Sequence, residues 1–91
     1  MLFATKYTFK GDQSPESVRE MLAVFAEQGA QEGEVAHYVA TNGRGGLIIG
    51  EADSMEEGYE RILRFSQWMD FDTTPILPID VAMGAVMKVY G

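Results

Sequence analysis

The chain has 91 residues, of which 46% are hydrophobic and 23% charged, so we predict one globular domain over residues 1–91. The net charge of −7 argues against a nucleic-acid partner, because such partners are bound mainly through Lys and Arg on phosphates. The absence of cysteine excludes disulfides, thiolate metal sites and a thiol nucleophile.

The sequence contains no apolar run near the ~20 residues of a membrane span, and no signal peptide at its start. We therefore expect a soluble, cytoplasmic protein without a membrane partner. We also expect no cofactor and no metal, because neither a cofactor fingerprint nor a ligand spacing is present. The acidic residues Glu51, Asp53, Asp70 and Asp72 are interpreted as solvated positions and not as a cation site.

The beginning of the chain has the pattern of a strand followed by a helix. Residues Leu2–Lys10 are rich in aromatic and β-branched residues, which predicts a strand. Ser14 and Pro15 have the pattern of a helix N-cap and first turn, and Gly29 is the expected stop signal. The helix between them has one apolar stripe, made by Val18, Met21, Leu22, Phe25 and Ala26.

The segment Val35–Glu51 predicts a β-hairpin with a glycine-rich turn and contains the only histidine, His37. A loop of two or four residues sets a register in which Val39 opposes Ile48 and His37 opposes Gly50. By alternation, one face carries Val35, His37, Val39, Ile48 and Gly50, and the other carries Ala36, Tyr38, Ala40, Leu47, Ile49 and Glu51.

A second helix is predicted after the hairpin. Ser54 and Glu57 form a capping-box pattern at its start, and its apolar stripe runs on to Met69. Trp68 falls outside that stripe, so we expect it to be covered by the C-terminal tail, a partner or a ligand, the tail being the simplest.

The end of the chain predicts a fourth strand and a short tail. Residues Asp70–Pro78 form the strand, and Pro75 and Pro78 restrict it to a sheet edge or an irregular end. Asp80 is the expected cap of a short final helix, which Gly84 weakens by about 1 kcal/mol relative to alanine. The alternative is a strand over residues 85–90.

This order of elements predicts an α+β, ferredoxin-like βαββαβ fold with an antiparallel sheet and a short C-terminal helical tail. Right-handed crossovers place the two main helices on one sheet face. The other face is left bare, and it is larger and more apolar than monomers normally expose. We therefore predict a homodimer in which two subunits pack sheet to sheet.

The sequence also resembles a known family. The resemblance lies in His37 with the turn Asn42–Gly46, in Glu51 and Asp53, and in the segment from Trp68 through Asp70 and Phe71 to Pro75. These residues are similar to those of an uncharacterised family of short dimeric α/β-barrel proteins, one of the domains of unknown function. A tryptophan commonly precedes the histidine in that family, whereas this chain has Ala36 there.

The resemblance implies a ferredoxin-like protomer in a barrel-shaped homodimer. The wider superfamily contains muconolactone isomerases, cofactor-free monooxygenases of antibiotic biosynthesis and small stress-responsive proteins. Because it includes both enzymes and binding proteins, kinship of fold does not decide whether this protein is an enzyme.

His37 is the natural proton-transfer group of this chain, because an unperturbed imidazole titrates near neutrality. The alternative is a structural histidine satisfied by a backbone or dimer contact. Arg44, at the hairpin tip, is a candidate to attract an anion. Glu51 is either an orienter of His37, after a one-residue slip of the strand, or a capping or ion-pair residue with Arg44 or Arg61.

Two hypotheses of function follow. In the first, a homodimer binds a small apolar or aromatic molecule, or a protein partner, at the open sheet face. In the second, the protein is a cofactor-independent isomerase or monooxygenase, with His37 as proton shuttle and Tyr38 or Arg44 stabilising negative charge. The candidate ligand-binding residues are His37, Tyr38, Tyr7, Arg44, Glu51 and Trp68.

Overall fold

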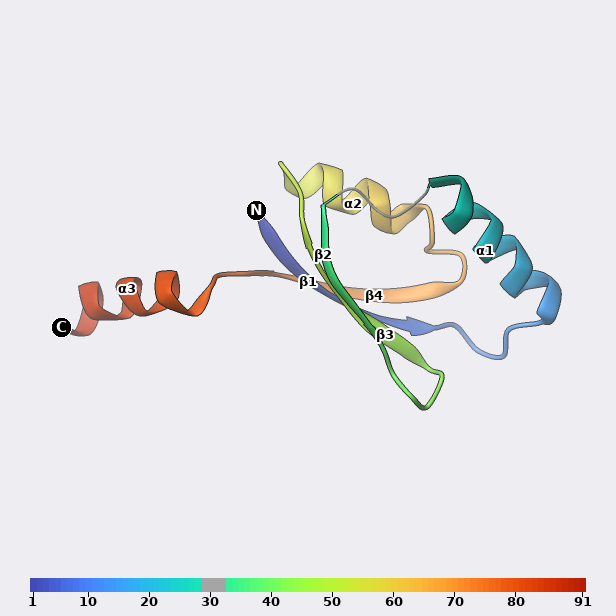
Figure 1. The fold of residues 1–91 in the computed structure, drawn as a ribbon, viewed down its shortest axis with the longest axis horizontal. Helices are drawn as coiled ribbons and strands as arrows, with labels where there is room; N and C mark the ends of the chain where they lie inside the picture. Colours follow the sequence, from blue (N-terminus) through green and yellow to red (C-terminus); the bar gives the residue numbers. More distant parts are fainter. Residues whose placement is uncertain (29–32) are drawn as a thin grey trace.

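The computed structural model describes residues 1–28 and 33–91. Its elements are, in chain order, β1 (Leu2–Phe9), α1 (Pro15–Gln28), β2 (Glu34–Val39), β3 (Gly45–Glu51), α2 (Met55–Leu63), β4 (Met69–Ile76) and α3 (Ile79–Tyr90). The four strands form an open antiparallel sheet in the order β2-β3-β1-β4. With the three helices this is a small, roughly ferredoxin-like α+β fold, as the sequence predicted (Figure 1).

Helices α1 and α2 lie on the same side of the sheet (Figure 1). Both begin where the sequence placed them, because a serine caps each one. The Ser14 hydroxyl accepts the Ser17 amide at 3.1 Å, and the Ser54 hydroxyl accepts the Glu57 amide at 3.2 Å. The predicted end of the first helix, Gly29, lies outside the described residues.

The buried residues of the described chain are few and mostly aromatic. On β1 they alternate, since Phe3 and Tyr7 are buried while Lys6 and Thr8 between and beyond them are exposed. The buried hydrophobic residues are Phe3, Tyr7, Ala52, Phe65 and Trp68. The core therefore lies between the sheet and the two helices.

The register of the hairpin differs from the prediction by two residues. His37 pairs with Ile48 and not with Gly50, and Val39 pairs with Gly46. The turn is centred one residue earlier than expected, because Gly43 takes a positive φ of 75° and the Asn42 side chain accepts the Arg44 amide at 2.9 Å. A shift of two leaves the side chains from Ala36 onward on their predicted faces.

A β-bulge in β2 changes the face of one residue. Ala36 pairs with Ile49, but Glu34, two positions earlier, pairs with Gly50. The extra residue brings Glu34 onto the face that carries His37.

The second helix is shorter than predicted, which changes the surroundings of Trp68. Helix α2 ends at Leu63, and the following turn brings the Trp68 amide within 3.0 Å of the Phe65 carbonyl. The two rings then pack with centroids 6.4 Å apart, and both are buried. The prediction that the C-terminal tail covers Trp68 is therefore wrong, because the turn itself buries this residue.

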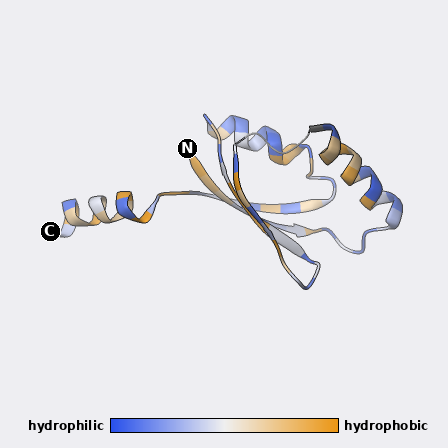
Figure 2. Ribbon diagram, in the orientation of Figure 1, coloured by the Kyte–Doolittle hydropathy of each residue, from blue (hydrophilic) through white to orange (hydrophobic). Residues whose placement is uncertain are grey.

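Strand β4 lies at a sheet edge, as its prolines predicted, and leads into a projecting helix. Helix α3 extends away from the sheet (Figure 1), and much of it is hydrophobic (Figure 2). Asp80 does not cap it, because Pro78 holds the N-cap position and no side chain bonds there. Its exposed apolar side chains are Ile79, Val81, Met83, Val86, Met87, Val89 and Tyr90.

Candidate functional site

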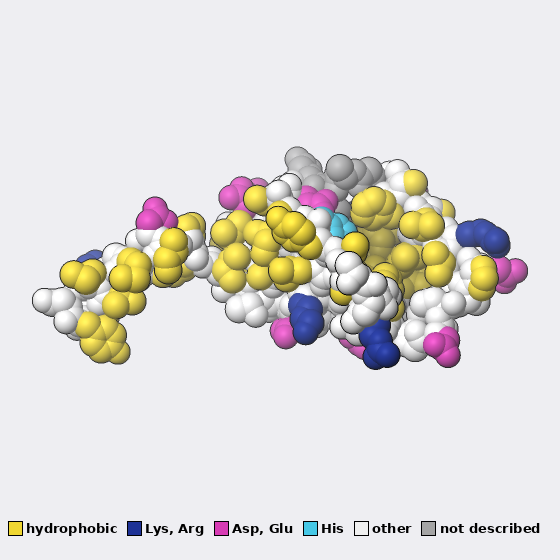
Figure 3. Space-filling model, turned by 60° about the horizontal axis from the view of Figure 1, so that its bottom comes forward, with side chains coloured by type: hydrophobic (Ala, Val, Ile, Leu, Met, Phe, Trp, Pro, Cys, Tyr) yellow, Lys and Arg dark blue, Asp and Glu magenta, His cyan; other side chains and the backbone are white. Residues whose placement is uncertain are grey.

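A cavity of about 280 Å³ lies between the sheet and the helices α1 and α2. Its walls come from all four strands and both helices, and they are mainly apolar. Hydrophobic side chains gather in the same part of the surface, next to the histidine (Figure 3). All five phenylalanines of the chain line the cavity: Phe3, Phe9, Phe25, Phe65 and Phe71.

Three polar side chains are connected in a chain at this cavity by one hydrogen bond and one ion-pair contact. The Tyr7 hydroxyl lies 2.7 Å from Nε2 of His37, and Nδ1 of His37 lies 2.9 Å from Oε1 of Glu34. The tyrosine and histidine rings meet edge to face, with centroids 5.6 Å apart. Tyr7 and His37 both line the cavity.

Two local features of the hairpin assemble this chain. The bulge in β2 turns Glu34 toward His37, as described above. Gly46 lies opposite Tyr7 in the sheet, and a Cβ at that position would collide with the Tyr7 hydroxyl and with the Tyr38 carbonyl. A glycine is therefore required at position 46 for Tyr7 to reach His37.

Tyr7 keeps its proton over an extended pH range. Burial raises the pKa of the Tyr7 phenol above its usual value of 10.0, and the nearby negative charge of Glu34 raises it further. At neutral pH the hydroxyl is therefore a neutral group that both donates and accepts hydrogen bonds.

Arg61, Thr5 and Thr73, which also line the cavity, bond to protein partners. The Arg61 guanidinium donates to the Glu57 carboxylate at 2.5 Å and to the Glu51 carbonyl at 2.9 Å. The hydroxyls of Thr5 and Thr73 lie 3.0 Å apart across β1 and β4. Glu51 thus contacts Arg61 through its backbone, and the ion pair of Arg61 is with Glu57 instead.

The structure brings together two of the predicted site residues, Tyr7 and His37, on the side of the sheet that faces the helices. Glu51 also borders the cavity. Tyr38 points to the opposite face, as the alternation predicted, and is 65% exposed. The sequence predicted a ligand at the open sheet face, but His37 and Tyr7 line the cavity on the other side of the sheet.

The remaining two predicted residues lie apart from the cavity wall. Arg44 is exposed in the hairpin loop, and Trp68 packs behind Phe65. The Trp68 indole N–H is buried and has no hydrogen-bond partner among the described residues.

Glu34 and the role of Gly46 were not predicted from the sequence. On a regular strand, residues three apart point to opposite faces, so the spacing of Glu34 and His37 argued against a contact. Only the bulge brings them together, and a glycine in a strand is the one sequence signal that pointed to a close approach.

Within residues 1–28 and 33–91 there is no group of three or more His, Cys, Asp or Glu side chains that would hold a metal ion. Over the same part of the chain, no helix has the length and apolar character needed to cross a membrane.

The fold and cavity define a small α+β protein with a roughly ferredoxin-like sheet and an aromatic-lined pocket. The family described as "Domain of unknown function (DUF3303)" matches residues 1–90, so the chain belongs to that family. This confirms the resemblance to an uncharacterised family. No curated protein matches the chain.

Proposed function

We propose that this protein binds a small apolar, aromatic molecule in the cavity between the sheet and helices α1 and α2. The observation that carries the proposal is the cavity wall, to which every phenylalanine of the chain contributes. An engineered apolar cavity of ~150 Å³ accepts benzene. A cavity of about 280 Å³ has room for a molecule of one or two fused rings.

The proposal includes a cytoplasmic homodimer formed through the open face of the sheet. That face carries Leu47 and Tyr38, which are 39% and 65% exposed, with Ile49 beside them on β3. Packing these residues against a second copy removes apolar surface from water. The ligand cavity lies on the other side of the sheet, so dimer formation leaves it accessible.

Filling the cavity tests the binding proposal. Gly50 lines the cavity, and a Cβ there meets only the Gly33 carbonyl oxygen, at an ordinary 3.6 Å. We expect 2-naphthol to raise the melting temperature of the native chain but not of Gly50→Leu. The control is Gly84→Leu, in α3, where a Cβ meets nothing.

A crystal soaked with 2-naphthol provides the direct test. Density for the ring among Phe9, Phe65 and Phe71 supports the proposal. Packed side chains in place of the cavity, or density only on the open sheet face, refute it.

A second candidate function is proton transfer, and the Tyr7–His37–Glu34 chain is the observation that favours it. Tyr7 would accept a proton from a bound substrate while its own proton passes to Nε2 of His37, and Glu34 would stabilise the resulting imidazolium. Returning the proton to another substrate atom completes an isomerisation. A monooxygenase would in addition take molecular oxygen as co-substrate.

Deuterium exchange of a bound ketone tests this second function. We expect the α-protons of 2-tetralone to exchange faster in D₂O with the native protein than with His37→Ala. Equal rates for the two proteins, at saturating 2-tetralone, would leave only the binding function.

A further inference from the structure

We propose that the oxygen of Tyr7 is the hydrogen-bond acceptor that selects ligands for the cavity. It favours aromatic molecules with a hydroxyl or N–H donor over matched molecules that lack one. His37 and Glu34 are positioning residues that set Tyr7 in this role. The inference rests on the proposed function, since it concerns the ligand of the same cavity.

The direction of the Tyr7–His37 hydrogen bond follows from Glu34. The Glu34 carboxylate lies 2.9 Å from Nδ1 of His37, and its negative charge favours the tautomer that carries the proton on Nδ1. When the ring is neutral, Nε2 is then an acceptor, and the Tyr7 hydroxyl donates to it across 2.7 Å. In that state the proton of Tyr7 is used within the protein, and its oxygen retains only accepting capacity.

Tyr7 is buried, and its hydroxyl bonds to no other group among the described residues than His37. A buried acceptor that receives no hydrogen bond in an apolar cavity costs free energy, because it has lost its hydrogen bonds to water. A ligand that supplies an O–H or N–H satisfies it, whereas an ether or a bare ring buries it without compensation.

The charges around the cavity disfavour anionic ligands. Glu34 carries a negative charge behind His37, and Arg61, a basic residue that lines the cavity, is already bonded to Glu57. A carboxylate in the cavity would also point an acceptor at the Tyr7 oxygen, another acceptor. The ligand class is therefore a neutral aromatic alcohol, phenol or N–H heterocycle.

The tautomer is directly measurable because the chain has one histidine. The ¹⁵N spectrum of the imidazole side chain is expected to show a proton on Nδ1 and none on Nε2 when the ring is neutral. A ring protonated on Nε2 would overturn the inference, because Tyr7 would then be free to donate to a ligand.

Four matched probes test the selection at the pH where that spectrum shows a neutral ring: 2-naphthol, 2-methoxynaphthalene, naphthalene and 2-naphthoate. We expect 2-naphthol to bind about fivefold more tightly than 2-methoxynaphthalene, as one net hydrogen bond implies. The naphthoate binds most weakly. In a soaked crystal, the naphthol oxygen lies within hydrogen-bond distance of the Tyr7 oxygen.

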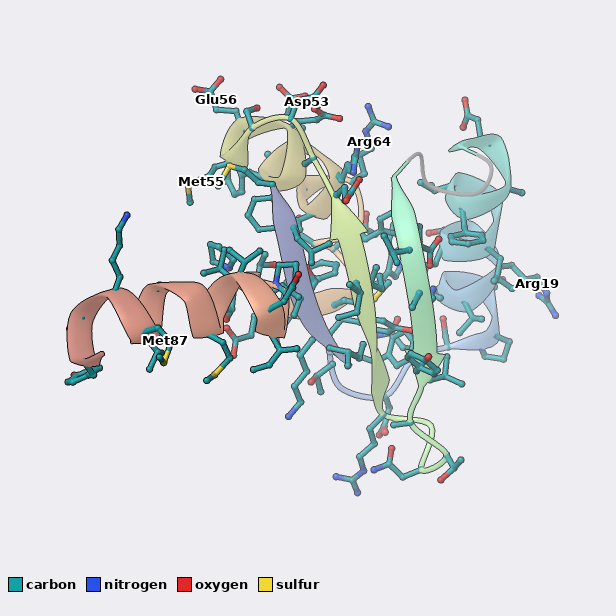
Figure 4. All side chains as sticks on the ribbon, turned by 60° about the vertical axis from the view of Figure 1, so that its left-hand side comes forward. Arg19, Asp53, Met55, Glu56, Arg64 and Met87 are labelled. Carbon is teal, nitrogen blue, oxygen red and sulfur yellow. The ribbon has the colours of Figure 1, made fainter. Side chains whose placement is uncertain are left out.

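Glu34→Gln tests the positioning role, because a purely structural role of Glu34 would not change the preference for 2-naphthol over 2-methoxynaphthalene. The substitution removes the carboxylate that holds the proton on Nδ1, so Nε2 can donate to Tyr7 and Tyr7 can donate to a ligand. We expect the preference to fall to about unity or to reverse toward 2-methoxynaphthalene. The control is Glu56→Gln at the start of α2, where the side chain points away from the sheet (Figure 4).

The outcomes separate the two proposals. If none of the four probes binds, both the proposed function and this inference fail. If the probes bind without regard to their donor, or if Glu34→Gln keeps the native preference, the cavity binds aromatic molecules and this inference alone is overturned.

Discussion

The two faces of the sheet are built from the same strands but differ in chemistry. A row of paired residues across the sheet shows this: Gly46, Tyr7 and Phe71 face the helices, whereas their neighbours Leu47, Lys6 and Asp72 face outward. The inner row combines aromatic rings with one hydroxyl, and the outer row combines an apolar side chain with two charges. Alternation along a strand therefore separates the aromatic-lined cavity from the outer surface through which we propose that a second subunit binds.

The difference in cover between the two faces explains why the cavity lies on the inner face. The inner face is covered by only two helices, and helix α2 has nine residues, none of them buried. Because the two helices do not fill the space above the aromatic side chains of the sheet, a cavity remains between them. The outer face has no cover of its own within the described chain.

A charge placed on the outer face should disrupt the proposed dimer and leave the cavity intact. Leu47→Glu is expected to weaken the proposed dimer by about 100-fold or more, because two-fold symmetry buries the new carboxylate twice. Light scattering would show about 10 kDa in place of twice that mass.

Binding of 2-naphthol should survive in Leu47→Glu, because Leu47 does not line the cavity. Thr41→Glu, in the exposed hairpin loop, is the charge-matched control and keeps the dimer. A native chain that already scatters as a monomer would contradict the outer-face role.

The next effect concerns the inner face. Gly46→Ala is expected to destabilise the fold by about 2–3 kcal/mol, because the new Cβ collides with the Tyr38 carbonyl and the Tyr7 hydroxyl. Urea unfolding measures the loss. Gly84→Ala is the matched control, and it should instead stabilise α3 by up to about 1 kcal/mol, since nothing lies near that Cβ. Equal stability of Gly46→Ala and the native chain would show that Tyr7 is free to move.

Much of the fold could be predicted from local signals. Ser14 and Ser54 marked the helix starts because a capping hydroxyl acts within one turn. Pro75 marked an edge strand because proline cannot donate to a second neighbour. These rules depend on a few adjacent residues, so the sequence alone suffices for them.

The site could be predicted only in part, because its assembly depends on features that are not local. His37 was recognised from its chemistry, and Tyr7 as one of its polar companions. Their contact needs the register of β3 against both neighbours, and the contact of Glu34 needs a bulge. Neither follows from alternation, which places residues on faces but does not say which positions along two strands meet.

Alkaline titration tests the surroundings of Tyr7 on the inner face. The pKa of Tyr7 is raised in the folded state by burial and then by Glu34, so the folded chain holds this proton more tightly than the unfolded chain. The resulting stabilisation is complete below the unfolded tyrosine pKa of about 10 and is lost as the pH rises from there through the folded pKa.

We therefore expect the native chain to lose stability above about pH 10 more steeply than Tyr7→Phe, as measured by urea unfolding at each pH. Absorbance at the tyrosinate band gives the second readout, in which Glu34→Gln lowers the midpoint for Tyr7. Parallel pH profiles for the native chain and Tyr7→Phe would contradict a raised pKa.

Helix α3 belongs to neither face of the sheet, so its removal should change the stability of the fold only slightly. Its side chains are exposed along the helix, Met87 among them at 63%, and it extends away from the sheet (Figure 4). A chain ending at Pro78 is therefore expected to keep its melting temperature within about 2 °C, because little packing is lost on deletion. A fall of 8 °C or more would show that α3 packs on the sheet of its own or a second copy. Measuring the deletion together with Leu47→Glu tells these apart: if α3 covers the outer face, the two changes are not additive.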